Sequence, residues 1–323
     1  MKHKVSFYCA ILAITIICSS WGFYAHKKIN QLAVYTLPSA MIKFYKNNIF
    51  YLREHAVDAD KRRYADSAEA PRHYLDADHY GEMPFDSIPE KWNEAVIKLT
   101  EDTLKKYGIV PWQIQRTYYN LVKAFEQQDS LKILRLSADL GHYVSDAHVP
   151  LHTTQNHNGQ FSNQVGIHGF WESRLPELFS AKYNFFVGRA QYIDDPLKEA
   201  WKIVRNTYSY KDSVLQIEAK LSKGFPSDRR YSFAERNGKV VKDYSEEYST
   251  AYHIALNGMV ERQMRSSIHK TASYWYSAWV DAGQPNLNHL SQIKKSASEE
   301  SKASENVEVY FKGGKIIGRA EAD

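Results

Sequence analysis

The sequence predicts an all-α fold, built as a single multi-helix domain, and two observations support this. In most of the long segments, apolar residues recur at the spacing that places them on one face of a helix. Alternating strand patterns are scarce, and the clearest one is confined to residues 307–320 near the C-terminus. We therefore expect a helical domain over residues 21–290, followed by a short C-terminal extension.

Three helices are expected in the middle of the chain. The apolar stripe of the first consists of Trp92, Val96, Leu99 and Leu104. Gly108 is placed as a C-terminal stop for this helix. Residues 111–128 and 130–149 are also expected to be helical, and Pro150 ends the second of them because proline cannot continue a helix.

A long helix over residues 244–280 is expected to close the domain. Its apolar stripe consists of Tyr248, Tyr252, Ala255, Met259, Ile268, Ala272, Trp275 and Trp279. Residues 291–306 are low in apolar side chains, which predicts a solvated linker within the segment 291–323.

The first 20 residues have the pattern of a secretory signal peptide. Lys2 and Lys4 provide positive charge, an apolar run follows, and small residues precede a cleavage site before Trp21. The apolar run is too short to span a bilayer, so no stable membrane span is expected. We therefore expect a secreted or periplasmic protein whose mature chain begins at Trp21.

Both cysteines of the chain, Cys9 and Cys18, fall within this leader. The mature chain would have neither a disulfide nor a thiolate ligand, which leaves histidines and carboxylates to bind any metal. Lipidation of Cys18 is the alternative to simple cleavage. Loss of Lys2 and Lys4 lowers the net charge from +5 to +3, which is too mild to indicate a nucleic-acid footprint.

The densest chemical pattern lies in the middle of the chain. His142 and Asp146 are four residues apart in a predicted helix, and His168 and Glu172 repeat that spacing. Each pair therefore occupies one helix face, and His152 lies between the two pairs. Imidazole and carboxylate ligands without sulfur suit zinc with open positions for water. One such pair is commonly an ordinary hydrogen bond, but two pairs flanking a histidine predict a binuclear metal site.

A polar stretch over residues 54–80 adds further carboxylates and histidines. Its candidates are Asp58, Asp60, His73, Asp76 and His79. Composition alone makes this stretch an ordinary charged loop.

Taken in order, these residues resemble those of the trinuclear zinc phosphodiesterases. That superfamily joins the bacterial zinc-dependent phospholipases C to the fungal and plant single-strand-specific nucleases. The shared order runs from Trp21 to Glu172: a terminal Trp, a His, an Asp, a His, then His-x3-Asp-x5-His and His-x3-carboxylate. The resemblance implies a largely helical fold and three zinc ions per chain.

The resemblance also implies three ligand sets. The first consists of Asp58, His73, His142 and Asp146, and the second of His152, His168 and Glu172. The third consists of His26, the bridging carboxylate of Asp146, and the α-amino nitrogen and carbonyl oxygen of Trp21. Signal cleavage would therefore create a metal ligand. The spacing before His73 favours Asp58 over Asp60, and Asp76 is expected to orient a ligand.

The reaction that the resemblance implies is hydrolysis of a phosphodiester. Paired zinc ions bring the pKa of a shared water toward about 7, and the resulting hydroxide attacks phosphorus in line. Asp146 would bridge two metals and orient that water. Asp146 and Asp58, a ligand of the first implied set, are the expected catalytic carboxylates. Arg62, Arg63 and Arg174 are close enough in sequence to contact phosphate, although surface positions are favoured for each.

The substrate indicated by these motifs is mixed. Glu172 as the last ligand resembles the phospholipases, because the nucleases usually carry Asp there. The five-residue gap between Trp21 and His26 resembles the nuclease branch instead. We expect phospholipid head groups as substrate, with single-stranded nucleic acid as the alternative. Five aromatic side chains near the ligands in sequence can form a platform for bases or a cage for choline: Tyr74, Tyr80, Phe161, Phe170 and Trp171. Core packing is favoured for most of them.

A non-catalytic secreted binding protein stabilised by zinc is a further alternative. Structural zinc sites are closed by four protein ligands, whereas the second predicted set has only three side chains. The open position favours catalysis.

Overall fold

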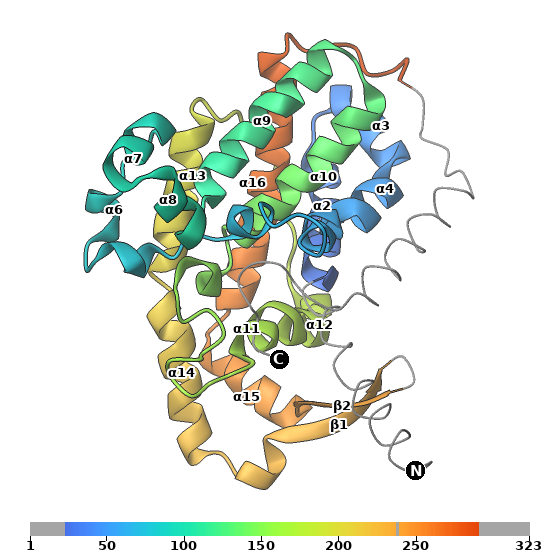
Figure 1. Cartoon of the computed structure of the whole chain (residues 1–323). Coiled ribbons are helices and arrows are strands. Elements are labelled where there is room, and N and C mark those ends of the chain that lie inside the picture. The colour runs from blue at the N-terminus through green and yellow to red at the C-terminus, as the bar shows by residue number, and fades with distance from the viewer. Residues whose placement is uncertain (1–22, 237–238, 291–323) are drawn as a thin grey trace, which may run out of the picture.

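The computed structural model describes residues 23–236 and 239–290, and helices dominate this part of the chain (Figure 1). The α-helices of the first half are α2 (Phe23–Ala33), α3 (Ser39–Asn47), α4 (Ile49–Glu54), α5 (Asp58–Arg62), α6 (Pro84–Ser87), α7 (Trp92–Leu99), α8 (Glu101–Tyr107), α9 (Val110–Glu126) and α10 (Ser130–Asp146). Those of the second half are α11 (Ile167–Gly169), α12 (Leu175–Phe179), α13 (Pro196–Tyr208), α14 (Lys211–Gly224), α15 (Glu246–Ala255) and α16 (Met259–Asp281).

Short 3-10 turns connect several of these helices. They include η2 (His55–Val57), η3 (Ala70–His73) and η5 (Pro150–Thr153). A π-helical segment, η6 (Phe170–Arg174), joins α11 to α12 without a break. Among the described residues the only strands are β1 (Tyr231–Arg236) and β2 (Lys239–Tyr244), which pair as an antiparallel hairpin with Tyr231 opposite Tyr244. The prediction of an all-α single domain is confirmed.

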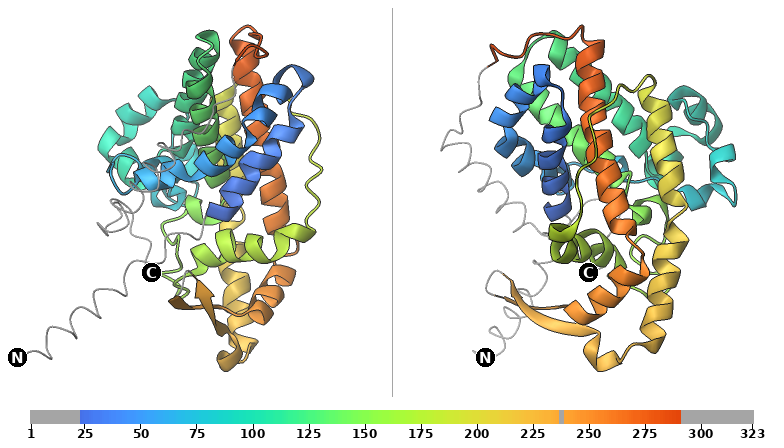
Figure 2. Two further views of the ribbon diagram at one scale, coloured as in Figure 1. Left: turned by 90° about the vertical axis from the view of Figure 1, so that its right-hand side faces the viewer. Right: turned by 180° about the vertical axis from the view of Figure 1, so that it is seen from behind.

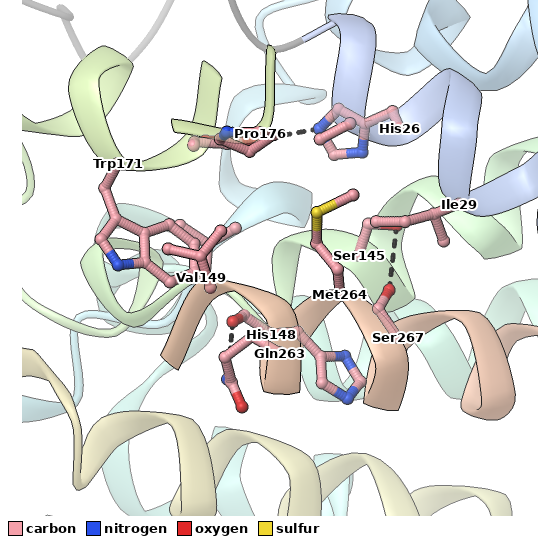
Figure 3. Close-up of a pocket in the computed structure, with 13 residues that line it drawn as sticks. His26, Ile29, Ser145, His148, Val149, Trp171, Pro176, Gln263, Met264 and Ser267 are labelled. Carbon is pink, nitrogen blue, oxygen red and sulfur yellow. Dashed lines mark hydrogen bonds and ion pairs between the residues drawn. The ribbon is translucent and has the colours of Figure 1, made fainter. Parts of the chain in front are cut away.

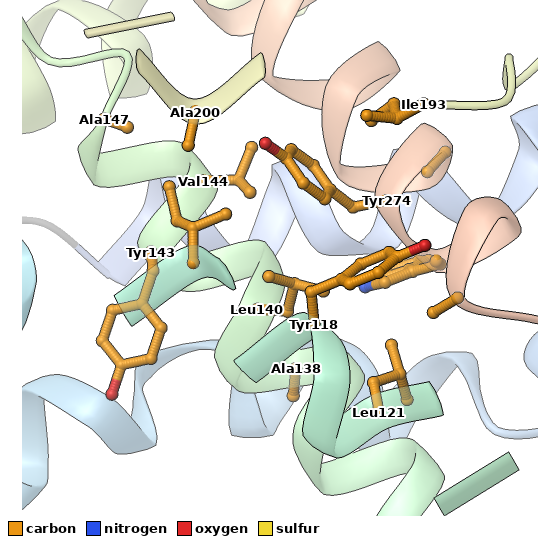
Figure 4. Close-up of a cluster of buried hydrophobic side chains, with 14 of the residues drawn as sticks. Tyr118, Leu121, Ala138, Leu140, Tyr143, Val144, Ala147, Ile193, Ala200 and Tyr274 are labelled. Carbon is orange, nitrogen blue, oxygen red and sulfur yellow. The ribbon is translucent and has the colours of Figure 1, made fainter. Parts of the chain in front are cut away.

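Two neighbouring hydrophobic clusters form the core. In the larger one, α9 packs against α10, α13 and α16 (Figures 1 and 2), and fully buried aromatic side chains such as Tyr118 and Tyr274 fill the space between them (Figure 4). The smaller cluster joins α2, the 167–179 helix, α14, α15 and the first turns of α16. Val144 of α10 belongs to the larger cluster, whereas Val149, just beyond its end, belongs to the smaller one. The C-terminal end of α10 therefore lies where the two clusters meet.

Two of the predicted helices are each divided in the structure. The segment predicted as one helix before Gly108 forms α7 and α8, because Thr100 between them adopts a positive φ of 67°. Gly108 ends α8 as expected, with φ of 97°. The prediction of one helix over residues 244–280 was wrong. Asn257 and Gly258, with φ of 47° and 74°, separate α15 from α16. Positive φ interrupts a right-handed helix but leaves the apolar periodicity of the sequence unchanged.

The β1–β2 hairpin was not predicted. Its sequence signal is the Asn237-Gly238 pair between two runs rich in β-branched and aromatic residues, which is a strong hairpin signature. The strand pattern predicted at 307–320 lies outside the described residues, as do the leader and the linker. None of the helices in the described ranges is long and apolar enough to cross a membrane.

A close approach of α10 to α2 and α16 fixes the position of the α10 end. At Gly141, a Cβ atom would lie 2.0 Å from the side-chain oxygen of Asn30 and 3.0 Å from Thr271. Asn30 is fully buried, and its amide nitrogen donates to the carbonyl oxygen of Ala138 at 3.1 Å. Glycine at position 141 therefore permits a helix contact that a larger residue would block.

Replacing this glycine tests the importance of the contact. Gly141→Ala is expected to lower the free energy of unfolding by about 1–3 kcal/mol, because the added methyl displaces Asn30 from its hydrogen bond in a close-packed core. Urea denaturation of chelator-treated protein measures this change without a contribution from bound metal.

The matched control is Gly224→Ala at the end of α14, where the added Cβ would meet no other part of the protein within 4 Å. This variant should match the wild-type protein or be slightly more stable. Equal stabilities for the two variants would contradict the proposed close approach.

Candidate metal centre

The candidate centre is built around the last turn of α10. His142 and Asp146 face the same side of that turn, with His142 Nε2 3.2 Å from Asp146 Oδ2. Both side chains are almost completely buried. The Nδ1–H of His142 donates to the carbonyl oxygen of Ala56 at 2.8 Å, so the lone pair of a neutral imidazole would lie on Nε2, facing the centre.

Asp60 and His73 complete a first donor group with His142 and Asp146. His73 Nδ1 lies 2.9 Å from Asp146 Oδ2 and 3.0 Å from His142 Nε2. Asp60 Oδ1 lies 3.6 Å from each of the same two imidazole nitrogens. Asp60, His73 and His142 each offer a ligand atom within 4.8 Å of the others, close enough to hold one metal ion.

The structure places Asp60 in this group and Asp58, the residue chosen from the sequence, outside it. The carboxylate of Asp58 is paired with His55 Nδ1 and with Lys61 Nζ, 2.9 Å away. The two aspartates lie two residues apart on α5, which separates their side chains by about 200° around the helix axis. Only one of them can face the histidines, and in this structure it is Asp60 rather than Asp58.

His152, His168 and Glu172 form a second donor group. His168 Nε2 lies 2.8 Å from Glu172 Oε2 and 2.9 Å from His152 Nε2. The pair His168 and Glu172 is brought together by its four-residue spacing within the continuous helix 167–179. The Nδ1–H of His152 donates to the carbonyl oxygen of His73 at 2.8 Å, which again leaves Nε2 facing the group.

His26, near the start of α2, joins the two groups. Its Nε2 lies 3.0 Å from Glu172 Oε1 and 3.4 Å from Asp146 Oδ1, and its ring stacks on that of His142 at 4.2 Å between centroids. Together, His26, His142 and Asp146 can form a third donor group. Asp146 therefore lies between the first and third groups, and Glu172 between the second and third. The resemblance implied such a bridging position for Asp146 alone. Trp21 lies outside the described residues.

The charges of three carboxylates, Asp146, Asp60 and Glu172, set the direction of the histidine pKa shifts in the centre. Burial lowers the pKa of His142, but Asp146 and Asp60 outweigh it and raise the pKa to about 10. Burial also lowers the pKa of His152, and Asp146 and Glu172 raise it to about 9. Conversely, burial raises the pKa of Asp146, whereas the neighbouring histidines bring it well below its usual value. The centre thus requires positive charge, as protons or as cations.

The donor set suits zinc ions. Imidazole nitrogens and carboxylate oxygens converge without any sulfur, and two of the imidazoles are oriented by hydrogen bonds from Nδ1 to backbone carbonyls. If the imidazoles were neutral, several acceptor atoms would face each other at about hydrogen-bond distance, an arrangement that a cation between them stabilises. The residues present therefore fit the metal that the resemblance implies.

Glu69 is a feature of the site that sequence reasoning missed. This fully buried carboxylate lies 3.5 Å from His73 Nε2, on the side away from the first group. Arg72 and Arg62 pair with it, and Tyr143 donates a hydrogen bond to it. A signal was present in the four-residue spacing of Glu69 and His73, which repeats that of the other ligand pairs.

The arginines and aromatic residues that the sequence also suggested for the site are not members of the three donor groups. Arg62 pairs with Asp139 at 3.0 Å, and Arg174 lies 3.4 Å from the buried Asp243. Arg63 Nη1 lies 3.9 Å from Asp60 Oδ1. The aromatic side chains of Tyr74, Phe170 and Trp171 are buried, Tyr80 is packed against the larger cluster, and Phe161 is 74% exposed. Core packing is thus confirmed for most of these rings.

Solvent reaches the centre from the sides of the first and second groups. The side chains of Asp60, His152 and His168 are 21%, 13% and 12% exposed, against 3% for His26. Behind His26 and Glu172 lies a small cavity of about 20 Å³, lined mainly by apolar atoms of residues such as Ile29, Trp171 and Met264 (Figure 3). A substrate would therefore approach past Asp60, His152 and His168, because the wall behind His26 is formed by the core.

Comparison with known proteins agrees with this geometry. The family model described as zinc dependent phospholipase C matches residues 25–234, a range that contains all the donor residues named above from His26 to Glu172. No match was found among curated proteins. The family match indicates a phosphodiesterase that depends on zinc. Because the match covers more than half of the 323 residues, this chain belongs to the zinc-dependent phospholipase C family.

Proposed function

We propose that this protein is a secreted phospholipase C-like enzyme that holds three zinc ions and hydrolyses the phosphodiester bond of phospholipid head groups. The observation that supports it best is the convergence of three donor groups on the shared carboxylates Asp146 and Glu172, next to the solvent-exposed edges of His152 and His168. A purely structural zinc site would be closed by four protein ligands, whereas the second group offers three side chains.

Each donor group would hold one zinc ion. The first would be held by Asp60, His73, His142 and Asp146, and the second by His152, His168 and Glu172. The third would be held by His26, Asp146 and the α-amino nitrogen and carbonyl oxygen of Trp21, with Glu172 Oε1 facing His26 at 3.0 Å. When bound, zinc would lower the pKa of a water molecule and neutralise charge that develops on the phosphoryl oxygens.

The protein side chains would orient this chemistry. Asp146 stays ionised because the surrounding histidines lower its pKa, so it can accept a hydrogen bond from the attacking water while its other oxygen faces His26. The Nδ1 hydrogen bonds of His142 and His152 to backbone carbonyls fix both rings. The apolar lining behind His26 would disfavour water on the inner side of the centre.

Glu172 and the family match favour a phospholipid over a nucleic acid as substrate. The five-residue gap between Trp21 and His26 favours a single-strand-specific nuclease, which is the second candidate. A hydrolysis assay on zinc-loaded protein that begins at Trp21 separates the two. We expect chelator-sensitive release of phosphocholine from phosphatidylcholine. Chelator-sensitive cleavage of single-stranded DNA without lipid hydrolysis would assign the chain to the nuclease branch, and no hydrolysis of either would favour a zinc-stabilised binding protein.

The choice between the two aspartates of α5 gives a matched pair of variants. Asp60→Ala is expected to weaken binding of one zinc ion and to lower turnover by about 100-fold or more, because it removes a first-group donor. Asp58→Ala should leave both within about twofold, because its half-exposed ion pairs contribute only about 0–1 kcal/mol to stability. Metal analysis after gel filtration and initial rates measure the two effects. A larger loss in Asp58→Ala than in Asp60→Ala would reverse the assignment.

The proposed role of the amino terminus predicts a sensitivity to extra residues. A chain carrying a short extension before Trp21 should hold one zinc ion fewer than the chain that begins at Trp21, because its α-amino group is no longer at that position. Removing the extension with a site-specific protease should restore the missing ion. Three zinc ions in the extended chain would show that Trp21 is not a terminal ligand.

A further inference from the structure

The segment that connects His152 to His168 joins two members of the same donor group. Its first part is bonded to a neighbouring turn, because Thr154 Oγ1 and the Gln155 N–H both donate to the carboxylate of Asp78, at 2.6 and 2.9 Å. The arrangement of this segment therefore sets where His168 lies relative to His152.

The segment turns back on itself at glycines. Gly159 and Gly166 both have positive φ, 73° and 98°, and the Gln164 N–H donates to the carbonyl oxygen of Gly159 at 2.9 Å. A Cβ atom on residue 159 would lie 2.4 Å from the carbonyl oxygen of Gln164, so only glycine allows this close turn. The chain then enters the helix 167–179, which carries His168 and Glu172.

Asn158 connects the middle of this segment to the start of that helix. Its side chain is buried, with 3% exposed. Its Oδ1 accepts hydrogen bonds from the N–H of Gly166 at 3.0 Å and from the N–H of His168 at 3.3 Å. The first N–H groups of a helix have no partner within the helix, so an acceptor from elsewhere stabilises both them and the position of the helix start.

We propose that Asn158 is a positioning residue for the second zinc site: its side-chain oxygen fixes the backbone of His168 so that His168 Nε2 meets His152 Nε2 and Glu172 Oε2. Asn158 acts through the backbone of His168 and contacts neither metal nor substrate. This inference rests on the proposed function, because it assumes that the second donor group binds zinc.

The test compares three variants for zinc affinity, measured by competition with a chromophoric chelator. Asn158→Ala should weaken one of the bound zinc ions by about 10–100-fold, the effect typical of losing a group that orients a ligand. Asn158→Asp should stay within about threefold of wild type, because a carboxylate keeps the acceptor and suits a helix N-terminus. A cobalt-substituted sample should show a changed visible spectrum in Asn158→Ala only.

Asn156→Ala is the matched control. Asn156 lies in the same segment, and its Oδ1 also accepts a backbone hydrogen bond, from the Phe161 N–H at 2.8 Å, but it does not reach the helix of His168. Asn156→Ala should keep the zinc affinity of wild type. Thermal unfolding of the zinc-free variants separates a general loss of stability from a loss confined to zinc binding.

Three results would overturn the inference. They are unchanged zinc affinity in Asn158→Ala, equal losses in Asn156→Ala and Asn158→Ala, and a loss in a folded Asn158→Asp as large as in Asn158→Ala. If Asn158→Ala does not fold, a loss of zinc affinity of about 10-fold or more in a folded Asn158→Asp would overturn the inference. Failure of the wild-type protein to bind zinc at the second group would contradict the proposed function instead, which distinguishes the two failures.

Discussion

The buried carboxylate of Asp146 is the constraint on which the centre depends. It is 1% exposed, and the removal of such a charge from water costs several kcal/mol unless positive charge compensates it. One oxygen faces His73 and His142, and the other faces His26 and His152. Segments far apart in the chain are thus brought together by a single ionised group, and any cation bound there satisfies the same requirement.

The helices around Asp146 hold it with little freedom. Gly141 allows α10 to approach α2 at Asn30, and Ser145 Oγ lies 3.2 Å from Ser267 Oγ of α16. Trp275 of α16 donates a hydrogen bond to the carbonyl oxygen of Ser137 at 2.9 Å. Ligand side chains on packed helices are held in position more tightly than those on loops, because neighbouring side chains restrict their rotamers. The centre therefore inherits its geometry from the core.

Much of the fold and most of the candidate site could be predicted from the sequence. The pairs His142–Asp146 and His168–Glu172 could be predicted because helical spacing alone places such residues on one face. The distance to His73 along the chain favoured Asp58, whereas the orientation of the two side chains on the five-residue helix α5 places Asp60 beside the histidines. The interruptions at Thr100 and at Asn257 were missed because a local change of φ does not alter the apolar pattern.

The residue His73 serves the centre twice, through its ring and through its backbone. Its Nδ1 faces the first donor group, and its carbonyl oxygen accepts the hydrogen bond that orients His152 of the second. The two groups therefore share one structural reference point, the short turn η3. An attempt to redesign one group for a larger or smaller cation by shifting this turn would also alter the other. A change of metal selectivity would therefore need simultaneous substitutions in the first and second donor groups, which His73 contacts through its ring and its carbonyl oxygen.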